Sequence, residues 1–152
     1  MTIRSGSLAD EDTCVDIWLD ALEARDGSLP PASSRDRAHA KFRQPIVRLG
    51  LAGGTSTPDG FALTVHCTDE AALLELIAVR PKVTQRGSGG ALLDDAVAAA
   101  ASSGYLCLDL WVRRGNDRAV ALYRSRGFSP TGEHEAHPLG GEPMLRYRTV
   151  FV

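Results

Sequence analysis

The sequence predicts a mixed α/β fold with elements in the order β-αα-βββ-α-β-α-ββ, and its 152 residues are expected to form one domain, 1–152. Three observations support this prediction. Residues 72–79 form a nearly continuous apolar run, as in a strand covered on both faces. Residues 14–22 carry apolar side chains at helical spacing, and glycine and proline clusters separate the periodic segments. A chain of this length can bury about 68–70% of the surface that it exposes when unfolded, which suffices for a core.

The first half of the chain is expected to form a strand, two helices and a hairpin. Acidic residues at 10–12 favour a helix start. Paired prolines within 27–34 end this helix, and Pro45 ends the next one. A turn at 53–59 joins two segments with strand composition. The expected elements are a strand at 2–5, helices at 10–26 and 35–44, and strands at 47–52 and 60–66.

The second half is expected to alternate strands and helices. After the strand at 72–79, a basic and glycine-rich connection at 80–90 leads into an alanine-rich helix. Apolar residues then alternate along 106–112, as they do in a strand. Gly127 is a typical helix stop. The expected elements are a helix at 91–101, a strand at 106–112, a helix at 116–126, and strands at 128–137 and 144–152.

Composition excludes several classes of protein. No run of about 18 apolar residues could span a membrane, and the N-terminal residues lack the layout of a signal peptide. The three cysteines are odd in number and have no CxxC spacing, so Cys14 and Cys107 are expected to be small core residues. The net charge of −2 does not favour nucleic-acid binding. We therefore expect a soluble protein of the cytoplasm, with no membrane and no nucleic-acid partner.

A glycine-rich turn between residues 79 and 93 is the segment most suited to chemistry. Gly87, Gly89 and Gly90 would let the backbone approach a ligand closely where a helix begins. The amides of 86–90 would face an anion there, with Arg80, Lys82 and Arg86 nearby. The spacing fits neither a P-loop nor a Rossmann turn, whose third glycine would fall on Leu92. A glycine-rich helix start without a ligand is the alternative.

A second motif accompanies this turn. Residues 110–128 have the pattern LxVxxxNxxAxxLYxxxGF, and the turn itself has VxPxxxxxGxG from Val79. Together, over residues 72–128, the two motifs resemble the GNAT superfamily of N-acetyltransferases. The resemblance implies a mixed, mostly antiparallel sheet of six to seven strands with about four helices. It also implies acetyl-CoA as co-substrate, no metal, and a chain that could pair as a homodimer.

The resemblance further implies a donor site. In the family, the strand matching 73–79 splays from the strand matching 106–112, and pantetheine pairs with the exposed strand backbone. Asn116 matches an asparagine that bonds the cofactor arm, although it could also, or instead, cap a helix. The family places Arg or Gln where this chain has Thr84, so we expect weaker donor binding. The implied cofactor-binding residues are Ile77, Ala78, Val79, Thr84, Gln85, Arg86, Gly87, Ser88, Gly89, Gly90, Asn116 and Tyr123.

Two side chains are candidates for catalysis. Tyr123 matches a tyrosine that protonates the leaving CoA thiolate, and a phenol of pKa about 10 gives its proton to a thiolate of about 8.5 only slightly uphill. The alternative is a tyrosine that only packs in the core. Glu75, the only charge within residues 72–79, is the leading candidate for the base that deprotonates the amine. It could equally be an edge-facing surface glutamate or a partner for an arginine, and His66 and His39 are lesser candidates.

The acceptor is expected to be a primary amine of a small molecule or peptide. In the family it binds between the loops that match 26–35 and 138–143. Residues 10–26 hold seven acidic side chains and one basic side chain, which would suit a cationic amine or could be an ordinary acidic helix surface. His134 and His137 would face opposite sides of a strand, which argues against a metal site. The alternative functions are a non-catalytic acyl-CoA-binding sensor or assembly domain, and an enzyme of nucleotide phosphates.

Overall fold

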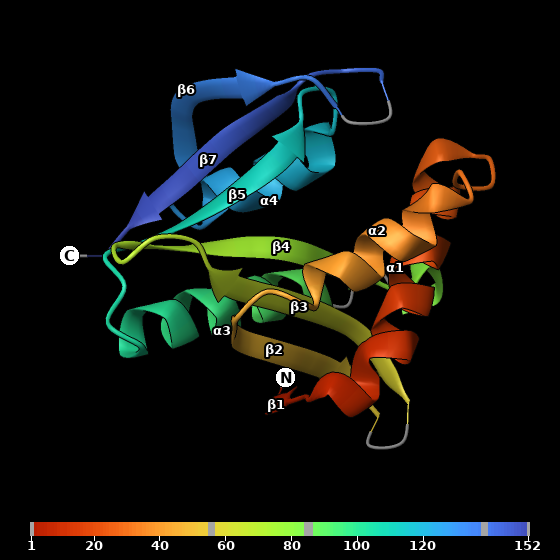
Figure 1. Cartoon of the computed structure of the whole chain (residues 1–152), viewed down its shortest axis with the longest axis horizontal. Helices are drawn as coiled ribbons and strands as arrows, with labels where there is room; N and C mark the ends of the chain where they lie inside the picture. The colour runs from red at the N-terminus through yellow and green to blue at the C-terminus, as the bar shows by residue number, and fades with distance from the viewer. Residues whose placement is uncertain (1, 55–56, 84–86, 138–139, 152) are drawn as a thin grey trace.

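The structure is a computed structural model, and it describes residues 2–54, 57–83, 87–137 and 140–151. Within these residues a seven-stranded sheet has the order β1-β2-β3-β4-β5-β7-β6 (Figure 1). The strands are β1 Ile3–Ser5, β2 Ile46–Gly53, β3 Pro58–His66, β4 Ala71–Val79, β5 Cys107–Arg113, β6 Ser129–Glu135 and β7 Met144–Val150. The helices are α1 Glu11–Asp26, α2 Ser33–Lys41, α3 Ser88–Ser102 and α4 Asp117–Ser125, with short 3-10 turns at Leu8–Asp10 and Pro81–Val83. The predicted fold class and element order are confirmed.

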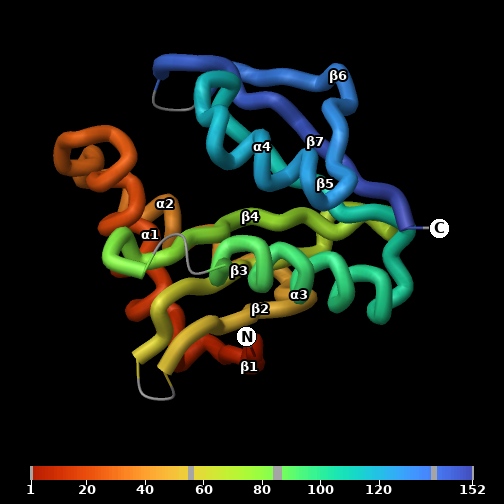
Figure 2. Tube along the Cα trace, turned by 180° about the vertical axis from the view of Figure 1, so that it is seen from behind, coloured from red at the N-terminus to blue at the C-terminus, as the bar shows by residue number. Residues whose placement is uncertain are grey.

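The sheet separates the core into two layers, and a pair of helices covers each layer. The helices α1 and α2 cover one face of β2 to β4, and their contact layer contains Ile17, Ala38 and Phe61. The helices α3 and α4 lie behind the sheet in Figure 1 and in front of it in Figure 2. Their layer includes Leu93 and Tyr123. No helix among the described residues has the length and apolar composition needed to cross a membrane.

The strands β4 and β5 are the only neighbours in the described sheet that run parallel, and they pair over a short distance. The pairing joins Ala71–Leu74 to Cys107–Leu110. Beyond Leu74, β4 continues alongside β3, whereas the described part of β5 continues alongside β7. The two strands diverge towards the end of the molecule where α1 and α2 lie (Figure 1). The expected splay is therefore present.

A β-bulge at Glu75 coincides with the start of this splay. Leu63 pairs with Leu76, but the next residue, Thr64, pairs with Leu74, so Glu75 is the extra residue of β4. The bulge reverses the alternation of faces, because Leu74 packs in the α3 layer while Leu76 packs in the α1 layer. The apolar run had predicted an uninterrupted strand.

Two further differences from the sequence prediction, and one feature that was not predicted, are local. The helix α3 begins at Ser88, three residues earlier than expected, because the glycines join its first turn. Leu106, expected to open β5, is exposed and precedes the strand. Asp109, whose environment was not predicted from the sequence, is fully buried, and Arg146 and Arg148 of β7 bind its carboxylate.

Candidate functional site

Two cavities meet at Tyr123, in the gap between β4 and β5. The larger cavity has a volume of about 540 Å³ and extends to the start of α3. The smaller cavity has a volume of about 250 Å³ and extends between α1, α2 and β5. The two cavities share the lining residues Arg25, Ile77, Asn116, Ala119 and Tyr123.

The larger cavity ends at unpaired amides of α3. Ala91 N–H donates to the Gly87 carbonyl at 3.0 Å, which is the first bond of the helix. The N–H groups of 87–90 therefore have no partner within the helix, and all four residues line the cavity. Gly87 adopts φ 81°, a conformation that L side chains rarely adopt. Such a helix start favours an anion. Thr84, Gln85 and Arg86, also predicted to bind the donor, lie outside the described residues.

The positive side chains near this end differ from those expected. Arg80 turns away, because it donates to the Pro58 carbonyl at 3.3 Å and to Asp20 at 3.4 Å. Neither Arg80 nor Lys82 lines the larger cavity, whereas Arg118 of α4 does. Arg118 lies within the second sequence motif, but nothing in the sequence indicates that it turns towards the first.

The free edge of β4 presents main-chain groups to the gap. Arg80 N–H donates to the Asp59 carbonyl of β3 at 2.7 Å. Because the bonded pairs of an antiparallel ladder alternate, Ala78 also directs its main-chain groups towards β3. Ile77 and Val79 therefore direct theirs to the opposite side, where β5 has moved away. Of the three predicted β4 residues, Ala78 lines the larger cavity but keeps its main chain within the sheet.

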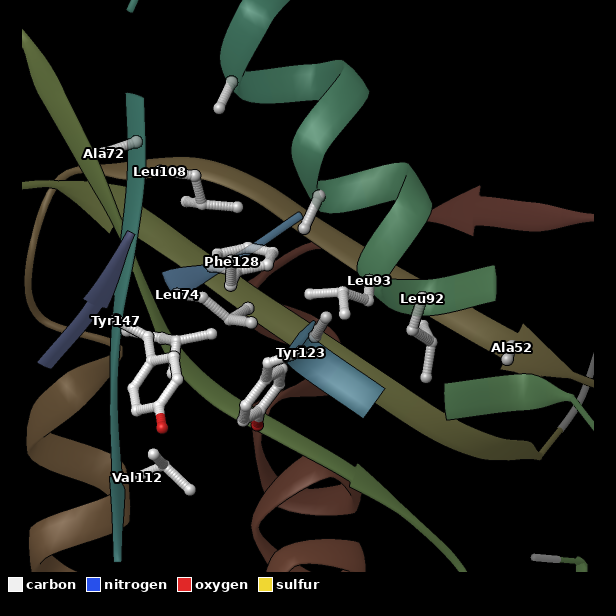
Figure 3. Close-up of a cluster of buried hydrophobic side chains, with 14 residues drawn as sticks. Ala52, Ala72, Leu74, Leu92, Leu93, Leu108, Val112, Tyr123, Phe128 and Tyr147 are labelled. Carbon is white, nitrogen blue, oxygen red and sulfur yellow. The ribbon is translucent and has the colours of Figure 1, made fainter. Parts of the chain in front are cut away.

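Asn116 and Tyr123 reach the junction of the cavities from α4. Asn116 caps this helix, since its Oδ1 accepts from Ala119 N–H at 3.3 Å, and its Nδ2 amide group is left for another partner. The ring of Tyr123 packs against Phe128 at 5.9 Å between centroids (Figure 3). Its hydroxyl has no hydrogen-bond partner in the described parts of the chain. Burial raises the pKa of Tyr123 to about 12, so this phenol carries its proton at neutral pH.

Glu75 lies in the smaller cavity as one half of an ion pair. Its carboxylate accepts from Lys41 Nζ at 2.8 Å and from Gln44 Nε2 at 2.7 Å. Only 13% of its side chain is exposed. Glu75 is therefore not a surface glutamate, and its partner is a lysine at the end of α2 rather than an arginine.

A second carboxylate also lines the smaller cavity. Asp26, at the end of α1, pairs with Arg25 at 3.0 Å and with Arg113 at 3.6 Å. The hydrogen bond from Arg25 and the charge of Arg113 lower the pKa of Asp26. Arg113 Nη2 also donates to His137 Nε2 at 3.5 Å, and burial together with nearby arginines lowers the pKa of this histidine. Sequence reasoning missed both Arg113 and His137 as cavity residues, although His137 borders the expected acceptor loop.

The remaining histidine candidates lie elsewhere. His39 binds Glu11 at 2.6 Å, and His66 binds the Tyr105 hydroxyl at 2.7 Å. Neither residue lines either cavity. In residues 2–54, 57–83, 87–137 and 140–151, no group of three or more His, Cys, Asp or Glu side chains is placed to hold a metal ion.

Comparison with known proteins places this geometry in a family. The profile of the acetyltransferase (GNAT) family matches residues 12–128, which include both motifs. The [ribosomal protein bS18]-alanine N-acetyltransferase of Salmonella typhimurium is 42% identical over 69 residues, which are 45% of this chain and 46% of that protein. The match thus spans less than half the length of this relative.

Two solved structures share the fold over almost the whole chain. The ribosomal-protein-S18-alanine N-acetyltransferase of Escherichia coli has a TM-score of 0.79 and 24% identity, covering 98% of this chain and 92% of that one. The PaiA N-acetyltransferase of Thermoplasma acidophilum, in complex with coenzyme A, has a TM-score of 0.77 and 19% identity, covering 99% and 98%. The profile match extends over most of the sequence and the same architecture recurs in these proteins, and the chain therefore belongs to the acetyltransferase (GNAT) family.

Proposed function

We propose that the chain is an N-acetyltransferase that moves the acetyl group of acetyl-CoA to a primary amine of a small molecule or peptide. One observation carries the proposal: the two cavities share a wall at Tyr123 and Ile77. A thioester entering from the larger cavity and an amine entering from the smaller one would meet there. The coenzyme A in the related PaiA structure supports the choice of donor.

The larger cavity has the groups that coenzyme A needs. The free amides of 87–90 suit the pyrophosphate, because they lie at the positive end of a 15-residue helix. The main-chain groups of Ile77 and Val79 suit the amides of pantetheine, which would add as a short strand. Asn116 can cap its helix with Oδ1 and donate to the cofactor arm with Nδ2. The roles of Thr84, Gln85 and Arg86 stay predictions.

The reaction we propose is a direct transfer. The neutral amine nitrogen attacks the thioester carbonyl carbon, forming the C–N bond, and the C–S bond breaks. The Ile77 N–H, facing the gap, would stabilise the developing negative charge on the carbonyl oxygen. Tyr123 would give its proton to the departing thiolate, and solvent would restore that proton after release.

The raised pKa of Tyr123 changes the energetics of this last step. Compared with an ordinary phenol, a pKa of about 12 makes the proton transfer about 3 kcal/mol less favourable if the thiolate stays at its usual value. However, the thiolate would form in the same desolvated space, and desolvation raises the pKa of a thiol as it does that of a phenol. The two shifts therefore oppose each other, and the phenol remains a competent acid.

Glu75 is our candidate for accepting the amine proton, directly or through water. Each of its oxygens accepts one hydrogen bond, which leaves lone pairs for a further donor. His137 is the one histidine among the described residues that line the smaller cavity. Its Nε2 lone pair is directed at Arg113, so its ring is less suited to take a proton.

A thiol-release assay across amine classes tests the proposed function. The panel includes amino acids, polyamines, aminoglycosides and peptides, among them peptides that begin with alanine, since the Salmonella relative acts on an alanine of a ribosomal protein. Cys67 is exposed and would react with thiol reagents, so the assay is best run on Cys67→Ser. Acetylated product with at least one amine is the expected result.

Tyr123→Phe separates an enzyme from a sensor. We expect kcat to fall about 100-fold or more while acetyl-CoA affinity is kept, because the phenol acts only as a proton donor. Tyr147→Phe is the matched control: Tyr147 is buried in the same cluster (Figure 3), but its hydroxyl binds Arg124 and lies outside both cavities. Acetyl-CoA binding without transfer to any amine would favour the sensor, and preferential binding of ATP in calorimetry would reject the acyl donor.

A homodimer stays a prediction, tested by light scattering.

A further inference from the structure

The smaller cavity carries an excess of positive charge. Its lining contains four cationic side chains and two carboxylates: Arg25, Arg37, Lys41 and Arg113 against Asp26 and Glu75. With His137 neutral, the sum is 4 − 2 = +2 for these lining residues. The acidic surface of 10–26, which suggested a cationic acceptor, therefore lies largely outside the cavity that an acceptor would enter, and only Asp26 of that segment contributes a carboxylate to it.

The carboxylates of the cavity are already paired. Lys41 holds Glu75 at 2.8 Å. Asp26 is shared between Arg25 at 3.0 Å and Arg113 at 3.6 Å. Arg37 has no ion pair or hydrogen bond to any described residue, although it is half-buried on the cavity wall. Partial removal of a guanidinium from water without an anion is unfavourable, so this wall favours a negatively charged group.

Arg35, a neighbouring arginine of α2, differs from Arg37 because it has an ion-pair partner. Arg35 lies two residues earlier, points away from the cavity and pairs with Asp16 at 2.9 Å. Arg35 thus has a carboxylate partner on the surface, whereas Arg37 has none among the described residues. The donor phosphates would not satisfy Arg37, because 87–90 line only the larger cavity, whereas Arg37 and Arg113 line only the smaller one.

We infer that the amine acceptor carries a carboxylate, and that Arg37, with Arg113 lining the same cavity, binds this carboxylate and so determines acceptor specificity. The inference rests on the proposed function. Arg37 and Lys41 are four residues apart on α2, so their Cβ atoms lie about 6 Å apart along one helix face. Because Lys41 holds Glu75, the candidate base, the amine and the carboxylate of the acceptor would be separated by a similar short distance. A free amino acid and the acidic start of a peptide share this chemistry, and a cavity of about 250 Å³ accommodates one residue of either.

Matched acceptors test the inference in the wild-type protein. Steady-state acetyl transfer is measured with alanine against alaninamide, and with peptides whose first residue is glutamate, glutamine or lysine. Within each series we expect kcat/KM to be about tenfold or more higher for the carboxylate than for the amide, and lowest for lysine, because charge-assisted bonds to arginine are strong. The amino-acid and peptide series distinguish the two sources of the carboxylate.

Arg37→Gln removes the proposed partner. The KM for the preferred carboxylate acceptor should rise about 10- to 100-fold, kcat should change much less, and the KM for acetyl-CoA should stay the same. Arg35→Gln, on the same helix but outside the cavity, should change none of these values. If Arg37→Gln folds poorly by its melting curve, Arg37→Lys serves instead and should weaken the preference without abolishing it.

The outcomes separate this inference from the proposed function. Thiol release with amides or polyamines at the rate of the carboxylate acceptors, or an unchanged preference in Arg37→Gln, overturns the inference and leaves the acetyltransferase proposal standing. Absence of transfer to every amine rejects the proposed function, and the inference with it.

Discussion

Tyr123 joins a buried ring to a hydroxyl that opens on a cavity, and its titration can be followed directly. The chain has three tyrosines, so the difference between ultraviolet titrations of the wild type and Tyr123→Phe isolates this phenol. We expect a midpoint of about 12, because burial disfavours the phenolate. The acid would then stay protonated over the whole useful pH range, and kcat/KM should show no alkaline loss from this group. A midpoint near the ordinary value of 10.0 would mean that water reaches the hydroxyl freely.

Asp109 is the most deeply buried charge among the described residues, and it holds β5 to β7. Its carboxylate accepts from Arg146 Nη2 at 2.5 Å and from Arg148 Nε at 2.7 Å. We expect Asp109→Asn to lower the free energy of unfolding by about 3–5 kcal/mol, because two arginines lose their shared anion. Urea unfolding measures this loss. The exposed pair of Asp94 and Arg126 is the control, and Asp94→Asn should cost less than about 1 kcal/mol.

The carboxylate of Asp109 also makes the stability of the fold depend on pH in acid. Burial raises the pKa of Asp109, but the hydrogen bonds from Arg148 and Arg146 outweigh burial, so the net pKa lies below the reference value of 3.8. A carboxylate with a lowered folded pKa contributes stability above the unfolded value and loses it as the pH falls through the folded value. The wild type should therefore lose stability below pH 3.8 in a component that Asp109→Asn lacks. Parallel acid unfolding curves for the two proteins would contradict this assignment.

At the level of elements, the features that could be predicted from the sequence are those that depend on the local pattern of residues. Helical spacing and strand alternation predict the order of helices and strands, because each element carries its own periodicity. The bulge at Glu75 depends on the register of β3, which is not a local property of β4. The charge of the smaller cavity was missed for a similar reason, since Arg37 and Arg113 are far apart in sequence and look like surface residues within their own segments.

At the start of α3, a substitution can test contact with the donor without straining the backbone. A Cβ at Gly89 would lie 3.7 Å from Leu122, an ordinary contact, but on the wall of the larger cavity. We expect Gly89→Ala to keep its stability and to raise the KM for acetyl-CoA about three- to tenfold, because the methyl group occupies space that the pyrophosphate needs. Unfolding curves and donor titrations give the two values. A variant with unchanged donor affinity would remove the amides of 87–90 from the proposed site.

Gly87 and Gly104 form a second comparison, one at each end of the same helix. Both have positive φ, 81° and 91°, and a Cβ added to either would meet no described atom within 4 Å. Alanine should cost each about 1–2 kcal/mol of stability. Only Gly87→Ala should also weaken acetyl-CoA binding, because only Gly87 lines the larger cavity. Equal donor affinities in the two variants would argue against a role for this turn.

At the scale of the whole molecule, the sheet consists of two parts joined by a short seam. Four residue pairs connect β4 to β5. We expect acetyl-CoA to stabilise the chain, because it would bind both sides of the gap and only in the folded state. At 100 times its dissociation constant the gain is about 2.7 kcal/mol, which raises the melting temperature of a chain of this size by about 5–10 °C. ATP at the same concentration should give a smaller shift, and equal shifts would reject specific binding of the acyl donor.

The free edge of β4 has a consequence for how such a protein can diversify. If the donor is held by peptide groups of the strand and of the helix start, its recognition is independent of most side-chain identities along them. Substitutions that reshape the smaller cavity, including those in α1 and α2, can then accumulate without loss of acetyl-CoA binding. New acceptors would be acquired by exchanging a few side chains around Arg37, with the backbone that serves the donor left unaltered.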